Sequence, residues 1–196
     1  MSTINVYLGI ITTGCSLKSK VLNLSLITDI YKERKFIYIE NNSIDKKKLN
    51  KENLDIYNNQ TLKNNENVFS NFNDIILCKC EEYKIPEYII YYLNEISNKE
   101  DKIIFHTLNP IDWFLFINIG FKIDEQLEIP ILDKRISRFP KDLLGHLCIG
   151  NIDENEIERI FNDTLIYEKD DFDTNSLIQS FVLKEKFKMI ENFKEE

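Results

Sequence analysis

Residues 6–14 constrain the fold most, because an apolar run of β-forming residues stops abruptly at Thr12-Thr13-Gly14. Such a run predicts a buried strand. The Thr-Thr-Gly ending predicts a tight turn whose glycine takes a backbone angle that other residues resist. We therefore expect the chain to begin with a core strand that ends in a turn.

Two further strands are expected directly after this turn. Residues 20–29 alternate apolar and polar side chains, which is typical of a strand with one buried face, and residues 35–40 form a third run of the same kind. A short charged turn separates the two runs. Three strands joined by short turns predict an antiparallel meander.

The middle and end of the chain predict helices that alternate with strands. We expect a short helix near residues 44–57, a strand from residue 74, and a helix that begins near Pro86 and runs to about residue 98. Residues 102–106 predict a buried parallel strand, after which Asn109 and Pro110 would begin another helix. Residues 121–152 predict a connection, residues 153–161 a short helix and residues 173–193 a closing amphipathic helix. Strand, helix and strand in this order indicate an α/β protein.

Composition and charge restrict the class of partner. The 196 residues fit one domain, residues 1–196, and the formal net charge of −8 should repel polyanions. Contact with a nucleic acid would therefore need a local basic patch, for which the candidates lie in one stretch: Lys134, Arg135, Arg138 and Lys141. A protein partner is the stronger expectation.

Cysteine usage and hydropathy indicate the compartment. Four scattered cysteines are too few for a disulfide-stapled secreted domain, and no leader or membrane-spanning stretch is evident in the sequence. We expect a cytoplasmic protein, of the cell or of a host cell, with no membrane contact.

The first strand resembles the first motif of the DEDD (DnaQ-like) 3′–5′ exonucleases, which reads hydrophobic strand, Asp, any residue, Glu, Thr, Thr, Gly. Here Gly9 stands where that family has Asp, and Ile11 stands where it has Glu. Residues 102–120 are similar to the second motif, a strand followed by a helix that carries Asp112 and Trp113. Within the family, this segment is closest to the small exoribonuclease-like branch.

The closing helix resembles the third motif, in which a His precedes a final Asp by five residues. The corresponding positions here are Asp170 and Asn175, so both depart from the pattern, and a slip of the alignment would bring Asp171 or Asp173 into the frame. The resemblance implies a ribonuclease H-like fold with a five-stranded mixed sheet and helices on both faces.

The substitutions bear on the chemistry that the family performs. Its members hold two Mg²⁺ or Mn²⁺ ions with four carboxylates, and hard dications need such oxygen ligands. With Asp112 as the one clear survivor, we expect no metal site, no cofactor and a catalytically degenerate protein that binds a protein or a nucleic-acid end, for example as an inhibitor or regulatory subunit. A retained ligand would lie beside Gly9, Thr12, Gly14, Asp112 and Trp113.

Three alternatives stay open at this point. An active Mg²⁺- or Mn²⁺-dependent exonuclease would need substitute carboxylates, for which the candidates are Asp29, Glu40, Asp170, Asp171 and Asp173. A zinc site would have to combine Cys78 and Cys80 with His106 and His146, at a spacing unlike that of structural zinc sites. An interaction module unrelated to exonucleases would be favoured if the first strand lay at a sheet edge.

Overall fold

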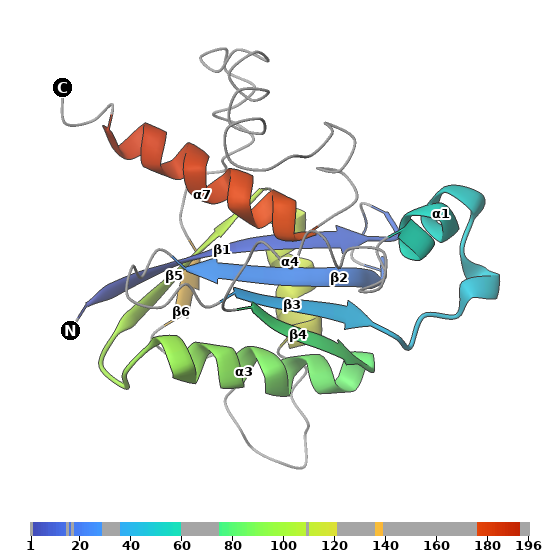
Figure 1. Ribbon diagram of the computed structural model, residues 1–196, viewed down its shortest axis with the longest axis horizontal. Helices are drawn as coiled ribbons and strands as arrows, with labels where there is room; N and C mark the ends of the chain where they lie inside the picture. Colours follow the sequence, from blue (N-terminus) through green and yellow to red (C-terminus); the bar gives the residue numbers. More distant parts are fainter. Residues whose placement is uncertain are drawn as a thin grey trace.

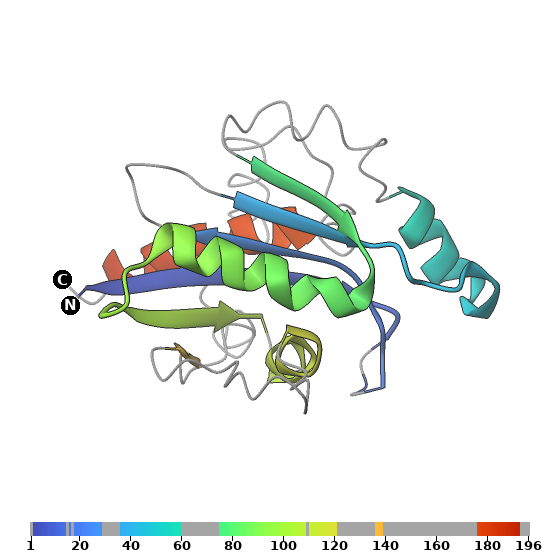
Figure 2. The same ribbon diagram turned by 90° about the horizontal axis from the view of Figure 1, so that it is seen from below.

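The computed structural model describes residues 2–14, 16, 18–28, 36–59, 75–108, 110–120, 136–138 and 176–192. These residues form one mixed sheet with helices on both faces (Figures 1 and 2). The expected helix at residues 153–161 lies outside the described residues.

The first three strands form the expected antiparallel meander. They are β1 (Thr3–Thr12), β2 (Val21–Thr28) and β3 (Phe36–Asn41), and β2 pairs antiparallel with both of its neighbours. Almost every residue of these strands is buried, because helices cover the sheet on both sides. The apolar run at the start of the chain is therefore a core strand, as predicted.

Parallel strands extend the meander at both edges. On one side β4 (Ile75–Cys80) pairs with β3, and on the other side β5 (Lys102–Thr107) pairs with β1. A three-residue strand, β6 (Ile136–Arg138), pairs parallel with β5 and gives the order β4-β3-β2-β1-β5-β6. The five-stranded mixed sheet is confirmed, with β6 as a short addition in a region predicted to be a connection. Three residues are too short a run to show strand periodicity.

Two helices cover one face of the sheet, and a third covers the other. The helices α3 (Ile85–Ile96) and α4 (Pro110–Gly120) begin where Pro86 and Pro110 predicted, and α7 (Ser176–Asn192) is the closing helix. Figure 2 shows α3 and α7 on opposite sides of the strands. None of the helices among the described residues is long and apolar enough to cross a membrane.

The helix expected near residues 44–57 begins later than predicted, as α1 (Lys51–Asn59). A short 3-10 turn, η1 (Lys46–Lys48), comes first, and the extended backbone of Leu49 separates it from α1. The Asn50 side chain then accepts a hydrogen bond from the Asn53 N–H at 2.8 Å, which caps the new helix. The polar residues Asp45 and Asn50 thus divide one predicted helix into two.

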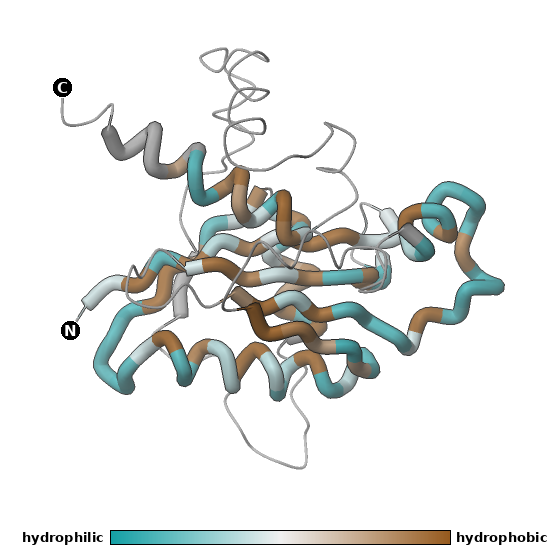
Figure 3. The backbone as a smooth tube through the Cα atoms, in the orientation of Figure 1, coloured by the Kyte–Doolittle hydropathy of each residue, from teal (hydrophilic) through white to brown (hydrophobic). Residues whose placement is uncertain are grey.

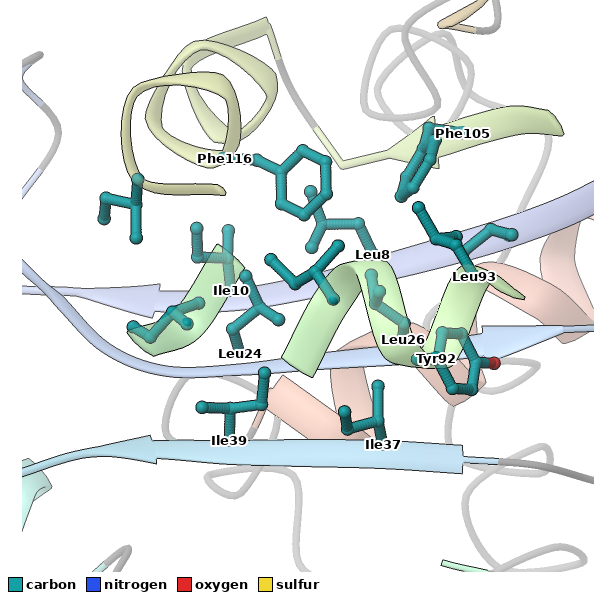
Figure 4. Close-up of a cluster of buried hydrophobic side chains, with 14 of the residues drawn as sticks. Leu8, Ile10, Leu24, Leu26, Ile37, Ile39, Tyr92, Leu93, Phe105 and Phe116 are labelled. Atoms are coloured by element: carbon teal, nitrogen blue, oxygen red, sulfur yellow. The ribbon is translucent and has the colours of Figure 1, made fainter. Parts of the chain in front are cut away.

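The main core lies between the sheet and the α3/α4 layer. In β1 every second side chain points into it, and Figure 4 shows Leu8 and Ile10 of that strand meeting side chains of β2, β3 and both helices. The hydropathy-coloured tube shows apolar residues along the sheet and along the inner side of α3 (Figure 3). Burial of this kind contributes about 25 cal/mol per Å² of apolar surface.

The thiols of Cys78 and Cys80 belong to this core, and burial raises the pKa of each to about 11. We expect neither to react with iodoacetamide at pH 8 in the native protein, since the thiolate is the nucleophile. Mass spectrometry of a C15S/C148S variant should show labelling only after addition of urea. Labelling of the native variant as fast as that of free cysteine would contradict this burial.

Candidate functional site

The position of Gly9 decides what the first strand can do. Gly9 lies between Leu8 and Ile10, whose side chains both face the main core. A side chain at position 9 would therefore point to the opposite face of the sheet, where α7 lies. A side chain at this position would overlap the Ser176 carbonyl oxygen. Its Cβ would also lie 2.7 Å from the Ser176 carbonyl carbon and 2.9 Å from the Ser180 nitrogen. The backbone of α7 therefore occupies the space in which a carboxylate of the first motif would lie.

Small polar side chains make this close approach possible. The residues that meet are Gly9, Asn23 and Ser25 of the sheet with Ser176, Gln179 and Ser180 of α7, which we call the β1–α7 contact. A glycine within a strand often marks a place where another backbone approaches closely. On the helix, Ser176 and Ser180 lie one turn apart, so both small side chains are on the same face of α7.

Hydrogen bonds fix α7 in this place. The Ser176 N–H donates to the Asn23 side-chain oxygen at 3.1 Å, and the Ser25 hydroxyl donates to the Ser176 carbonyl at 2.5 Å. Buried polar groups are costly unless they are paired, so these bonds hold the first turn of α7 at one position.

Gln179 extends the β1–α7 contact to the edge of β1 that faces β5. The ladder between β1 and β5 ends at the Leu8–Thr107 pair, beyond which β1 has no described strand on that side. There the Ile10 N–H donates to the Gln179 side-chain oxygen at 3.1 Å. The sequence did not lead us to predict site roles for Gln179, Asn23 and Ser25. The signal that could have indicated this contact was the pair of serines at positions 176 and 180, one helical turn apart.

Ile11 is also unavailable as a ligand position. Its side chain is buried with Leu22 and Tyr57 of α1 in a small apolar cluster. The resemblance predicts that a metal-binding Glu would occupy this position in an active family member, whereas this chain packs an aliphatic side chain under α1. Both first-motif positions are thus filled by packing.

The residues of the turn have ordinary structural roles. The Thr12 hydroxyl donates to the Gly14 carbonyl at 2.6 Å, which closes the turn. The expected special backbone angle of Gly14 is wrong, because its φ lies outside the left-handed region, and a Cβ there would meet the Ser19 hydroxyl at 3.3 Å. Beside this turn lies a polar pocket of about 450 Å³, bordered by Thr13 and by the loop before α1.

Trp113 does not share a cleft with Gly9, and Asp112 lies near the start of the helix that carries Trp113. Asp112 lies half-buried in the first turn of α4, where the helix dipole favours a carboxylate. Trp113 packs on Phe105 and Phe116 at ring-centroid distances of 5.6 and 5.8 Å, on the α3/α4 side of the sheet. The sheet therefore separates Trp113 from the side of β1 that Gly9 faces.

The remaining predicted site residues have no described side chains. Arg138 ends β6, where its backbone pairs with Phe105. The others lie outside the described residues: Lys134, Arg135, Lys141, Asp170 and Asn175. Among the substitute carboxylates, Glu40 is described; it is buried on β3 and bound to Lys79 at 2.7 Å. It lies two strands across from Ile11, because both residues are in register with Asn23 of β2.

His106 lies on the α7 side of the sheet, whereas Cys78 and Cys80 face the main core. Its Nε2 is 2.9 Å from the Asn5 side-chain oxygen, and its ring contacts those of Tyr7 and Phe187 at centroid distances of 4.9 and 4.0 Å. The zinc alternative needs Cys78, Cys80 and His106 around one ion. It cannot form, because the sheet separates His106 from the two cysteines. Within the described part of the chain, no cluster of three His, Cys, Asp or Glu residues could hold a metal ion.

Comparison of the chain with protein-family models, with curated proteins and with solved structures found no match.

Replacement of Gly9 by alanine should destabilise the fold by about 3 kcal/mol, because the added methyl group would collide with backbone atoms of α7 that cannot rotate away. Urea unfolding followed by circular dichroism measures the change. Gly14→Ala is the matched control and should change the free energy of unfolding by less than about 1 kcal/mol. Equal effects of the two substitutions would contradict the close approach.

Burial lowers the pKa of His106 to about 4. Because this value lies below the unfolded value of about 6.5, neutral His106 stabilises the fold above pH 6.5, and about 3 kcal/mol should be lost as the pH falls from 6.5 to 4. NMR titration of the imidazole in a His146→Asn variant, where His106 is the one remaining histidine, should give a midpoint near 4. A midpoint at or above 6.5 would contradict the buried position.

Proposed function

We propose that this protein is a non-catalytic relative of the DEDD exonucleases, with a ribonuclease H-like fold, that works by binding another protein. The observation that carries the proposal is the overlap between any side chain at position 9 and the Ser176 carbonyl. A two-metal site needs a carboxylate at this position, and here a helix backbone fills the space.

The arrangement of elements supports the family part of the proposal. The chain opens with three antiparallel strands, β5 returns parallel to β1, and helices cover both faces of the sheet. The first strand lies between β2 and β5, in the interior of the sheet, which disfavours the unrelated interaction module. The helix with Asp112 follows the strand beside β1, as the second motif requires.

Charge and surface composition favour a protein over a nucleic acid as the partner. The net charge of −8 opposes contact with a phosphate backbone. Five large apolar or aromatic side chains are exposed on the described surface: Leu77, Tyr83, Tyr91, Ile111 and Phe114. Aromatic residues are enriched in the cores of protein interfaces.

A nuclease assay tests the absence of catalysis. We expect no shortening of 3′ ends when single-stranded RNA or DNA, labelled at its 5′ end, is incubated with the full chain and Mn²⁺. Asp112→Ala should leave this result unchanged, because a single carboxylate cannot neutralise two dications. Shortening from the 3′ end that Asp112→Ala abolishes would establish the active-enzyme alternative.

A further inference from the structure

The strand β4 forms the edge of the described sheet on the side away from β6 (Figure 2). An edge strand exposes a row of backbone N–H and C=O groups, which can pair with another extended chain. Leu77, at the middle of β4, is 44% exposed although it is a large apolar side chain. This edge therefore combines backbone hydrogen-bonding groups with an apolar contact.

The hydrogen bonds of β4 show which of its residues face outward. The Asn42 N–H donates to the Cys80 carbonyl at 2.9 Å, so the backbone groups of Cys80 point towards β3. Because backbone direction alternates along a strand, Ile76 and Cys78 also point inward, while Ile75, Leu77 and Lys79 point outward. Among the described residues, no backbone hydrogen bond reaches these three residues on the outer side.

The usual protection of an edge strand is weak here. Lysine at an edge, proline and β-bulges discourage pairing with other chains. Within β4 the one lysine is Lys79, and its ammonium group binds the buried Glu40 carboxylate at 2.7 Å. The strand contains no proline, and its register with β3 runs without a shift. The charge that could repel an incoming strand is thus already paired.

We propose that β4 binds an extended segment of a partner protein as an additional strand. This inference rests on the proposed function, since it names the surface through which the chain would bind a protein. The expected segment carries an apolar residue over Leu77 and a lysine or arginine beside Glu81. Main-chain hydrogen bonds provide affinity in this mode of recognition, and alternate side chains provide specificity.

Charge complementarity identifies the segment as basic. Glu81 directly after β4 and Glu87 in the first turn of α3 are both exposed, with the single exposed cation Lys84 between them, on a chain with a net charge of −8. A second copy of this chain is disfavoured because it would bring the same negative charge.

Selection from a displayed peptide library tests the proposal on the full chain. The library contains ten-residue peptides with Val, Ile or Thr at alternate positions and Lys or Arg at the others. We expect enriched sequences whose synthetic peptides bind the wild-type protein. Leu77→Pro, which removes an outward N–H, should weaken binding more than tenfold, whereas Leu77→Thr, which keeps that N–H, should weaken it less than fivefold.

Methylated peptides provide a second test that leaves the protein unchanged and applies even if Leu77→Pro fails to fold. The enriched peptide is made in two forms, with N-methyl groups on odd or on even residues. One form should lose binding more than tenfold and the other should keep it, since alternate N–H groups face β4.

Equal binding of the two methylated forms, or no enriched peptide, would overturn strand addition. Dimerisation of the chain through β4, measured by sedimentation and abolished by Leu77→Pro, would replace the proposed partner with a second copy. These outcomes are independent of the nuclease assay, so failure at β4 can be distinguished from failure of the proposed function.

Discussion

The structure depends on the close approach of α7 to β1. At Gly9 the strand has no side chain, and the helix backbone enters the space that this leaves. Hydrogen bonds from Ser25 to the Ser176 carbonyl and from the Ser176 N–H to Asn23 then hold the helix there. Because these buried groups satisfy one another, separating α7 from the sheet would leave several of them unpaired at once.

This contact gives the two faces of the sheet different characters. The α3/α4 face is a continuous apolar core, whereas the α7 face combines three smaller apolar clusters with buried polar groups. Lys184 of α7 illustrates the second kind, because its buried ammonium group donates to the Thr28 carbonyl at 3.2 Å. Polar pairing of this kind fixes the position of a helix more precisely than apolar burial does.

Much of the fold could be predicted from the sequence, because hydrophobic periodicity and the prolines at positions 86 and 110 mark the strands and helices directly. The division of residues 44–57 could not, since it depends on both Asp45 and Asn50 acting as caps, each for its own short helix. The position of Trp113 could not be predicted either, because a sequence motif does not reveal which face of the sheet its helix covers. The absence of carboxylates at positions 9 and 11 was evident, but the reason why no side chain fits at position 9 lies in α7, more than 160 residues away in the chain.

The proposed loss of catalysis and the proposed gain of binding concern different parts of the sheet. The interior strand β1 is closed by α7, while no strand of the described residues pairs with the outer side of the edge strand β4. In this proposal, one scaffold loses a metal site at β1 and recognises a protein at β4. A crystal structure after a manganese soak tests the central claim most directly. The account predicts van der Waals contact between Gly9 and the Ser176 carbonyl and no anomalous peak beside residues 9 and 11. A pair of manganese ions at that position, with α7 displaced from Gly9, would contradict it.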